Sequence, residues 1–300
     1  MSLRRSGSGR WRQARSNPKV VTGVAILAFF GLVVAAHPVL QATLWSGQGR
    51  LYDPVIGFDH LVAHPSAPSG THWLGTDSLG RDVASMFTYA ARASVTVAVS
   101  SGAAIALVAL GLGSVAAYRR GWADGLITHT SDAMVLLPAL LVVWVLGVGR
   151  PDQQFGALEV GLAFGIVYGL GPATAAVRAA GLGVMAKPFV EAARASGAGG
   201  YWTISRHLLP HLVPHAAVQA MIGVTGAVVA EAFLNFRSAI GDRIGFGYLV
   251  YEGLTWREMF AGILEIPWWT LITGTAGITL LAAAFYLMGV GLREVFDPRS

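Results

Sequence analysis

The chain has 300 residues, of which 54% are hydrophobic and only 12% are charged, and its mean hydropathy is +0.57. A soluble domain usually carries about 25% charged residues, so this composition excludes an ordinary soluble protein and indicates a lipid bilayer. The formal net charge of +5 does not indicate nucleic-acid binding, because the basic residues are scattered between hydrophobic stretches. Cysteine is absent, which excludes disulfides, thiolate metal sites and a cysteine nucleophile.

The N-terminal residues 1–19 are basic and polar, and residues 20–41 after them are apolar. This order is also typical of a cleaved signal peptide. The apolar stretch is longer than the hydrophobic region of a signal peptide, however, and no small-residue cleavage site closes it. We therefore interpret residues 20–41 as the first transmembrane helix and residues 1–19 as a cytoplasmic segment.

Residues 42–92 form a polar loop rich in Pro, Gly, Ser and His, which we place outside the membrane. In the core that follows, residues 93–292, five stretches are long and apolar enough to cross a bilayer, which takes about 20 residues per helix. They are residues 93–118, 126–146, 158–177, 215–236 and 268–292. A polar tail, residues 293–300, ends the chain. The sequence thus predicts an all-α membrane protein with six transmembrane helices.

The orientation of these helices follows from the basic residues, since cytoplasmic loops of membrane proteins are enriched in Lys and Arg. Six crossings place both termini on one side, which then carries the larger group of basic residues. That group is Arg4, Arg5, Arg10, Arg12, Arg15, Lys19, Arg119, Arg120, Arg178, Lys187, Arg194, Arg206, Arg293 and Arg299. The other side carries Arg50, Arg81, Arg92, Arg150, Arg237, Arg243 and Arg257. We predict that both termini and the loop 178–214 are cytoplasmic.

The loop 178–214 contains the signals of a short helix. Pro188 can open a helix, Glu191 lies in its favourable first turn, and Gly197 can end it. A second short helix, residues 201–209, should stop at Pro210, which cannot continue the hydrogen-bond ladder. This pattern predicts a helix-turn-helix below the membrane, whose alanine surface lets another protein approach closely. The alternative is a plain linker in which Glu191 is an ordinary helix acid.

This segment resembles the EAA motif of ABC-importer permeases, through Glu191, Ala192, Ala193, Gly197, Leu209 and Pro210. In that family the loop is the coupling helix, which sits in a cleft of the ATPase subunit. The older consensus has isoleucine where this chain has His207, but the peptide-permease branch often reads RHxLP, as this chain does from Arg206 to Pro210. The resemblance implies the fold of a type I ABC importer permease with a cytoplasmic coupling helix.

A second motif precedes the second hydrophobic stretch. It reads GTDSLGRD and includes Gly75, Thr76, Asp77, Gly80, Arg81 and Asp82. Asp77 can cap a turn, Gly80 can supply a backbone angle that other residues avoid, and Asp82 can start a helix, so a merely capped loop is the alternative. The motif is similar to the LGTDxxGRD signature of C-type dipeptide, oligopeptide and nickel permeases.

The resemblance covers nearly the whole chain. Weaker matches are Asp132 followed by Pro138, the pair Trp268 and Trp269, and the ending from Gly291 to Arg299. The chain departs from the family after the fifth stretch, where it reads EAFLNFRSAIGDRIGFGYLVYEG instead of a sequence beginning EAxLSFLGLG. That segment lies near the outward gate of such permeases, so the departure leaves the cargo open.

Five residues inside or beside the hydrophobic stretches have predicted roles. Gly161, Gly165 and Gly169 are spaced four apart on one helix face, which predicts a tight helix contact, although such small residues also occur without a specific partner. Glu231 is a candidate for the transport pathway, the gate or a contact with a second permease. Asp132 is a further pathway candidate, for which we favour a structural pairing with Arg119 or Arg120.

Histidine spacing does not predict a metal site. His207, His211 and His215 recur every four residues, but Pro210 and Pro214 are expected to interrupt that helix. His60 and His64 lack a third ligand at suitable spacing. We expect no metal and no other cofactor in this chain.

The resemblance implies a transport subunit of the bacterial plasma membrane and not an enzyme. No HExxH, GxSxG or GxxxxGK[ST] motif is present, so ATP and magnesium are expected in partner subunits. The implied partners are a homologous second permease, two ATPase subunits or one fused ATPase, an extracytoplasmic substrate-binding protein and the lipid bilayer. The implied cargo is di- or oligopeptides, with nickel, haem or glutathione as alternatives. A secondary transporter is less favoured, because no inverted repeat is visible.

Overall fold

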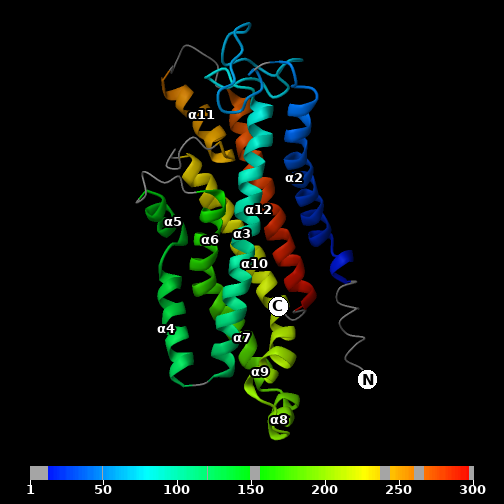
Figure 1. Ribbon diagram of the computed structural model, residues 1–300, viewed down its shortest axis with the longest axis vertical. Coiled ribbons are helices and arrows are strands. Elements are labelled where there is room, and N and C mark those ends of the chain that lie inside the picture. Colours follow the sequence, from blue (N-terminus) through cyan, green and yellow to red (C-terminus); the bar gives the residue numbers. More distant parts are fainter. Residues whose placement is uncertain are drawn as a thin grey trace.

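The computed structural model describes residues 13–48, 50–119, 121–148, 156–236, 244–259 and 267–296. Within these ranges the regular secondary structure is helical, and the one β-type pairing is an isolated antiparallel bridge between Thr76 and Asp82. The helices form an elongated bundle, with a large loop at one end and two short helices at the other (Figure 1). Several basic residues used to predict the orientation lie outside the described residues, namely Arg4, Arg5, Arg10, Arg12, Arg120, Arg150, Arg237, Arg243 and Arg299.

Five helical segments are long and apolar enough to cross a membrane. They are α2 (Pro18–Ala42), α3 (Val83–Tyr118), the segment Ala157–Met185 that contains α6 (Ala157–Tyr168) and α7 (Thr174–Met185), the segment Gly200–Phe236 that contains α9 (Gly200–Thr203) and α10 (Leu209–Phe236), and α12 (Trp268–Phe296). The bent pair α4 (Trp122–Leu136) and α5 (Ala139–Val148) supplies a sixth. Two more helices, α8 (Pro188–Ala195) and α11 (Phe246–Met259), lie between these segments. The predicted all-α membrane architecture is confirmed.

The third crossing is not the single helix expected over residues 126–146. Its two helices, α4 and α5, are bent by 81° where Leu137 and Pro138 separate them. Leu137 has an extended backbone, with φ −87° and ψ 116°, because a following proline disfavours the helical conformation. A hydropathy pattern cannot detect such a break, since the residues on both sides of it are equally apolar.

The short helix predicted over residues 201–209 does not end at Pro210, so this prediction was wrong. Helix α9 passes through a π-helical turn, Ile204–Leu208, directly into α10. In this wider turn the N–H of Leu209 donates to the carbonyl of Ile204, five residues back. The widening relieves the clash that the ring of Pro210 would cause in a regular α-helix. A loop helix and a membrane helix are therefore one continuous element.

Helix α3 begins at Val83, earlier than the predicted residue 93. The side chain of Asp82 caps it by accepting a hydrogen bond from the N–H of Ser85, at 2.7 Å. Its first three turns bury Val83, Met86 and Ala90 in a cluster with Phe246 and Trp269. Tertiary packing therefore makes residues 83–92 helical, although the sequence predicts that they belong to the polar loop 42–92.

The predicted glycine stripe lies against α3. A Cβ atom added to Gly165 would be 2.7 Å from the Cβ of Ala104 and 2.7 Å from the carbonyl oxygen of Ser101. One added to Gly169 would be 3.0 Å from the Cβ of Val108, and Gly161 is still more crowded. The three glycines thus bring the backbone of the fourth crossing close to that of α3.

Candidate functional site

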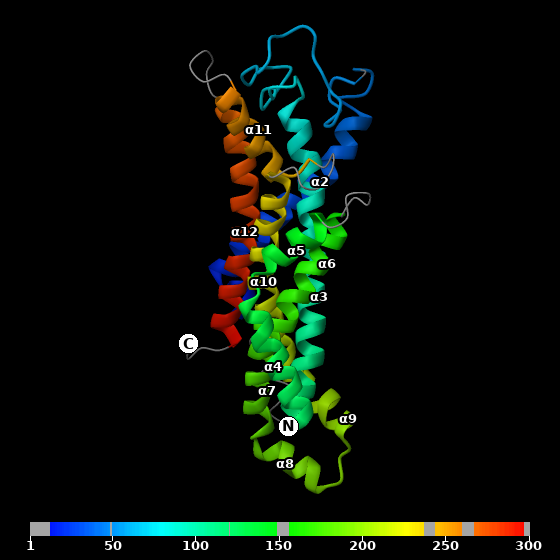
Figure 2. The same ribbon diagram turned by 90° about the vertical axis from the view of Figure 1, so that its left-hand side faces the viewer.

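The two sequence motifs lie at opposite ends of the molecule (Figures 1 and 2). Following the predicted orientation, we call residues 43–82 the outer cap and residues 188–203, which contain α8 and α9, the inner hairpin. Figure 2 shows α8 beyond the end of the bundle, farther from the outer cap than any labelled membrane helix. The two motifs can therefore contact different partners.

The inner hairpin presents part of the alanine motif to its surroundings. Glu191 and Ala192 are exposed, and Ala193 is half-buried. Gly197 ends α8 with a φ of +84°, and the N–H of Ala198 donates to the carbonyl of Ala193 at 3.1 Å. Apart from its neighbours in the chain, no heavy atom of the described residues lies within 4 Å of the position where a Cβ of Gly197 would stand. The glycine therefore serves the backbone turn, and the surface beside it is open.

The opposite face of α8 is held against the start of α10. Val190 is only 1% exposed and belongs to a cluster with Val184, Leu208 and Leu212. The ring of Phe189 stacks on that of His211, with centroids 5.7 Å apart. Leu209 and Pro210, the last residues of the motif, lie in α10 and not at the tip of the hairpin. The structure thus places side chains of α8 in direct contact with those at the start of α10.

The GTDSLGRD segment forms a tight turn before α3. The carboxylate of Asp77 accepts hydrogen bonds from the N–H groups of Leu79, at 3.0 Å, and Arg81, at 2.7 Å. Gly80 and Gly75 have φ angles of +82° and +75°, which side chains disfavour. A Cβ on either glycine would also clash with neighbouring atoms of the outer cap. The glycines are thus required by backbone conformation as well as by space.

Arg81 connects this turn to α11, a contact that sequence reasoning missed. It is only 6% exposed, and its guanidinium donates to Asp77 at 2.7 Å and to the hydroxyl of Tyr248 at 2.9 Å. The hydroxyl of Tyr248 donates in turn to Glu252 at 2.6 Å, and Ser78 donates to the same carboxylate at 2.7 Å. Burial, together with the hydrogen bond to Glu252, raises the pKa of Tyr248 to about 12. Tyr248 therefore stays neutral and donates.

His72 forms a second buried connection that sequence reasoning missed. Its Nδ1 lies 2.8 Å from Asp82, the cap of α3, and its Nε2 lies 3.1 Å from Asp59. The N–H of Leu61 and the imidazole lower the pKa of Asp59, whereas burial raises the pKa of Asp82. Asp59 is thus the carboxylate that keeps its charge more readily. The indole of Trp269 adds a link to α12 by donating to the carbonyl of Thr76 at 2.9 Å.

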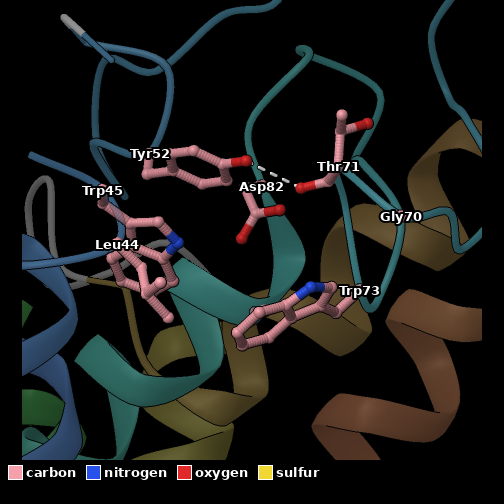
Figure 3. A pocket seen from close by; sticks show the side chains of 8 residues that line it. Leu44, Trp45, Tyr52, Gly70, Thr71, Trp73 and Asp82 are labelled. Atoms are coloured by element: carbon pink, nitrogen blue, oxygen red, sulfur yellow. Dashed lines mark hydrogen bonds between the residues drawn. The ribbon is translucent and has the colours of Figure 1, made fainter. Parts of the chain in front are cut away.

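A recess of about 150 Å³ lies beside this network (Figure 3). Trp45, Tyr52 and Trp73 surround Asp82 there, and the hydroxyl of Tyr52 donates to the carbonyl of Thr71 at 2.8 Å. Trp45 and Tyr52 stack with centroids 5.2 Å apart. Binding pockets for drug-sized ligands usually measure about 300–1,000 Å³, so this recess is too small for a whole peptide.

Glu231 lies inside the bundle and is only 3% exposed. Its carboxylate accepts from the hydroxyl of Ser94 on α3 at 2.9 Å and from the amide of Asn235 at 2.6 Å. A Cβ on Gly245, just before α11, would be 2.8 Å from the same carboxylate. Glu231 thus joins α3, α10 and the entry to α11, and its role in the pathway, at the gate or in a contact with a second permease stays a prediction. Part of the segment that departs from the family, residues 237–243, lies outside the described residues.

Asp132 is exposed on α4 and has no ion pair with Arg119, while Arg120 is outside the described residues. The ion pair that connects α4 to α7 is formed by Asp124 and Arg178, at 2.6 Å. The pairing of Asp132 with Arg120 stays a prediction.

The three histidines of the predicted interrupted helix lie on a continuous one. His211 Nδ1 is 2.7 Å from the carbonyl of His207, within the region of the π-helical turn. Among the residues that the structure describes, no three His, Asp or Glu side chains are grouped so that they could hold a metal ion.

Comparison with known proteins agrees with these features. Residues 109–300 match the family described as binding-protein-dependent transport system inner membrane component. The chain is 33% identical over 293 residues to the "Probable peptide ABC transporter permease protein y4tQ" of Sinorhizobium fredii, covering 96% of this chain and 92% of the relative.

Two further relatives carry related names. The "Dipeptide transport system permease protein DppC" of Bacillus subtilis is 30% identical, with 96% of this chain and 84% of the relative covered. The "Probable D,D-dipeptide transport system permease protein DdpC" of Escherichia coli is 28% identical, with 95% and 89% covered. The chain belongs to the family of binding-protein-dependent transport system inner membrane components, the permease subunits of ABC transporters.

Proposed function

We propose that this chain moves di- or oligopeptides into the cell, as one of two homologous permease subunits driven by partner ATPases. ATP and magnesium would bind to those ATPases, and an extracytoplasmic binding protein would deliver the peptide to the side of the outer cap. The names of the relatives support a peptide cargo. Nickel, haem or glutathione remains the alternative cargo, since related systems carry them.

The observation that carries this proposal is the continuity of the inner hairpin with α10. The segment Gly200–Phe236 has 37 residues, which at about 1.5 Å per residue spans roughly 55 Å, more than a bilayer core of about 30 Å. Its inner end packs on α8 through Leu208 and Leu212, and its outer end carries Glu231. A movement imposed by ATPase closure on α8 would reach the segment before α11 through this one continuous helical segment.

Such coupling requires that the ATPases hold α8 differently in two states. The exposed surface of Glu191 and Ala192 is suited to that contact, because small side chains let a partner's backbone approach. The outer cap would remain on the opposite face, where the binding protein docks. Both termini would be cytoplasmic, as the distribution of basic residues predicts.

The experiment is co-purification of the tagged chain with its ATPase subunits. Ala192→Trp puts a large side chain on the exposed face of α8 and should reduce the co-purified ATPase at least ten-fold, as well as peptide-stimulated ATP hydrolysis. Ala67→Trp, the same change on an exposed residue of the outer cap, should leave ATPase binding unchanged. Full ATPase recovery and normal stimulation with Ala192→Trp would refute the assignment of the hairpin.

A further inference from the structure

A second polar pocket, of about 310 Å³, lies outside the two sites described above. It is located where α7, α10 and α12 meet, and Figure 1 shows the C-terminal end of α12 beside α10. Its lining residues are Ala176, Ala180, His215, Val218, Gln219, Arg293 and Phe296. The two alanines lie on α7, and their small side chains leave room for the pocket. The polar side chains come from α10 and α12.

The depth of this pocket in the bilayer follows from the length of α12. Its 29 residues span about 43 Å at roughly 1.5 Å per residue, longer than a hydrocarbon core of about 30 Å. Arg293 lies in the last turn of this helix. We therefore expect the pocket at the level of the lipid headgroups, where charged side chains are hydrated and can meet phosphate.

The charges of the described residues in and around the pocket favour an anion. The neighbouring Glu294 is engaged elsewhere, since it forms an ion pair with Lys19 and accepts a hydrogen bond from Asn17 at 3.2 Å. None of the described residues that line the pocket is acidic, and within the described parts of the chain Arg293 has no ion-pair partner. A guanidinium is a strong, geometrically specific donor to phosphate, and the amide of Gln219 adds a neutral donor.

We propose that this pocket binds a phosphate-bearing anion. Both an anionic lipid headgroup and free phosphate carry that group, and basic pockets between membrane helices are known to bind anionic headgroups on the cytoplasmic side. Phe296 and Val218 provide an apolar wall for the part of the lipid acyl chains next to the headgroup. Arg293 also complements the C-terminal dipole of α12, but that role alone requires neither the alanines of α7 nor Gln219.

The test uses the full chain, purified in a neutral detergent, with phosphatidylglycerol, phosphatidylcholine and inorganic phosphate as probes. Binding is measured by native mass spectrometry and by the shift of the thermal unfolding midpoint. Phosphatidylglycerol should bind and stabilise the wild-type chain more than phosphatidylcholine does. Arg293→Gln should lower that affinity about five-fold or more, and Ala180→Leu, which fills the pocket but keeps the charge, should lower it similarly.

The matched control is Arg119→Gln, which removes an exposed arginine at the C-terminal end of α3 and should leave the affinity unchanged. If inorganic phosphate stabilises the wild type as much as phosphatidylglycerol does, and only through Arg293, the site is supported and its ligand comes from solution. Equal binding of both lipids, or unchanged phosphatidylglycerol binding in both Arg293→Gln and Ala180→Leu without any response to phosphate, would overturn the proposal.

Discussion

The outer cap and the inner hairpin are held in different ways. In the outer cap, buried charged groups satisfy one another: Arg81 bridges Asp77 and Tyr248, and His72 bridges Asp59 and Asp82. The inner hairpin has no such network among its described side chains and is attached by one apolar face. A self-satisfied cap can keep the outer ends of α3, α11 and α12 together without a partner, whereas the hairpin leaves its free face for one.

The largest expected effect is the loss of Arg81 from the cap. Arg81→Gln leaves the carboxylate of Asp77 buried without its cation, which typically costs about 3–5 kcal/mol of unfolding free energy. Thermal or denaturant unfolding in detergent would measure it. Arg50→Gln removes an exposed arginine near the same cap and should change stability by less than about 0.5 kcal/mol. Equal effects of the two changes would show that the cap is not held by its buried charges.

The helix bundle between the outer cap and the inner hairpin is held by close backbone packing, which a second substitution tests. Gly165→Leu would drive a side chain into the backbone of α3, where a Cβ already comes within 2.7 Å of Ser101, so we expect a loss of about 3 kcal/mol and poor assembly. Gly111→Leu is the control, because no atom of another described helix or loop lies within 4 Å of its Cβ position. Unchanged assembly and transport with Gly165→Leu would contradict the tight contact between α6 and α3.

Glu231 lies on α10, which is continuous with the inner hairpin, and it connects this helix to α3 and to the entry of α11. Glu231→Ala would leave Ser94 and Asn235 without their buried acceptor, at a cost of about 2 kcal/mol, and should impair uptake. Glu231→Gln keeps an acceptor oxygen and should retain most of the stability. Peptide uptake and the unfolding midpoint are measured on both variants. Uptake unaffected by either change would remove Glu231 from the proposed gate.

The smallest expected effect on stability is at the hairpin, and it sharpens the contrast with the cap. Gly197→Ala places a side chain at a φ of +84°, which costs about 1 kcal/mol without any clash. Because this turn shapes the surface that we propose contacts the ATPase, peptide-stimulated ATP hydrolysis should fall several-fold. Gly199→Ala is the control, since Gly199 has a φ of −66° and equal space. Similar hydrolysis in both variants would contradict the role of the turn.

Much of the fold could be predicted from hydropathy and from motif order, because long apolar stretches must become helices in lipid. The six crossings and the two motifs at opposite ends belong to this part. The bend before Pro138 and the helix through Pro210 were not predictable in this way. Proline signals an interruption, but whether a bend or a π-helical turn results depends on neighbouring helices. Ser131, for example, donates to the carbonyls of Leu170 and Gly171, near the kink at Pro172.

The side-chain networks were largely hidden from sequence reasoning. Arg81 and Tyr248 are 167 positions apart, and no periodic pattern connects residues at such separation. His72 gave no signal, because a single histidine in a polar loop has no distinctive spacing. The turn formed by Asp77, Gly80 and Asp82 was better predicted, since its hydrogen bonds join residues close in the chain.

The membrane orientation of the inner hairpin tests the central claim most directly. The chain has no cysteine, so single cysteines can be introduced at two exposed positions, Ser196→Cys in the hairpin and Ser69→Cys in the outer cap. A membrane-impermeant maleimide should label Ser69→Cys on intact cells, and Ser196→Cys only in inverted vesicles stripped of peripheral ATPase. Labelling of Ser196→Cys on intact cells would contradict the account, because an exterior hairpin cannot be driven by a cytoplasmic ATPase.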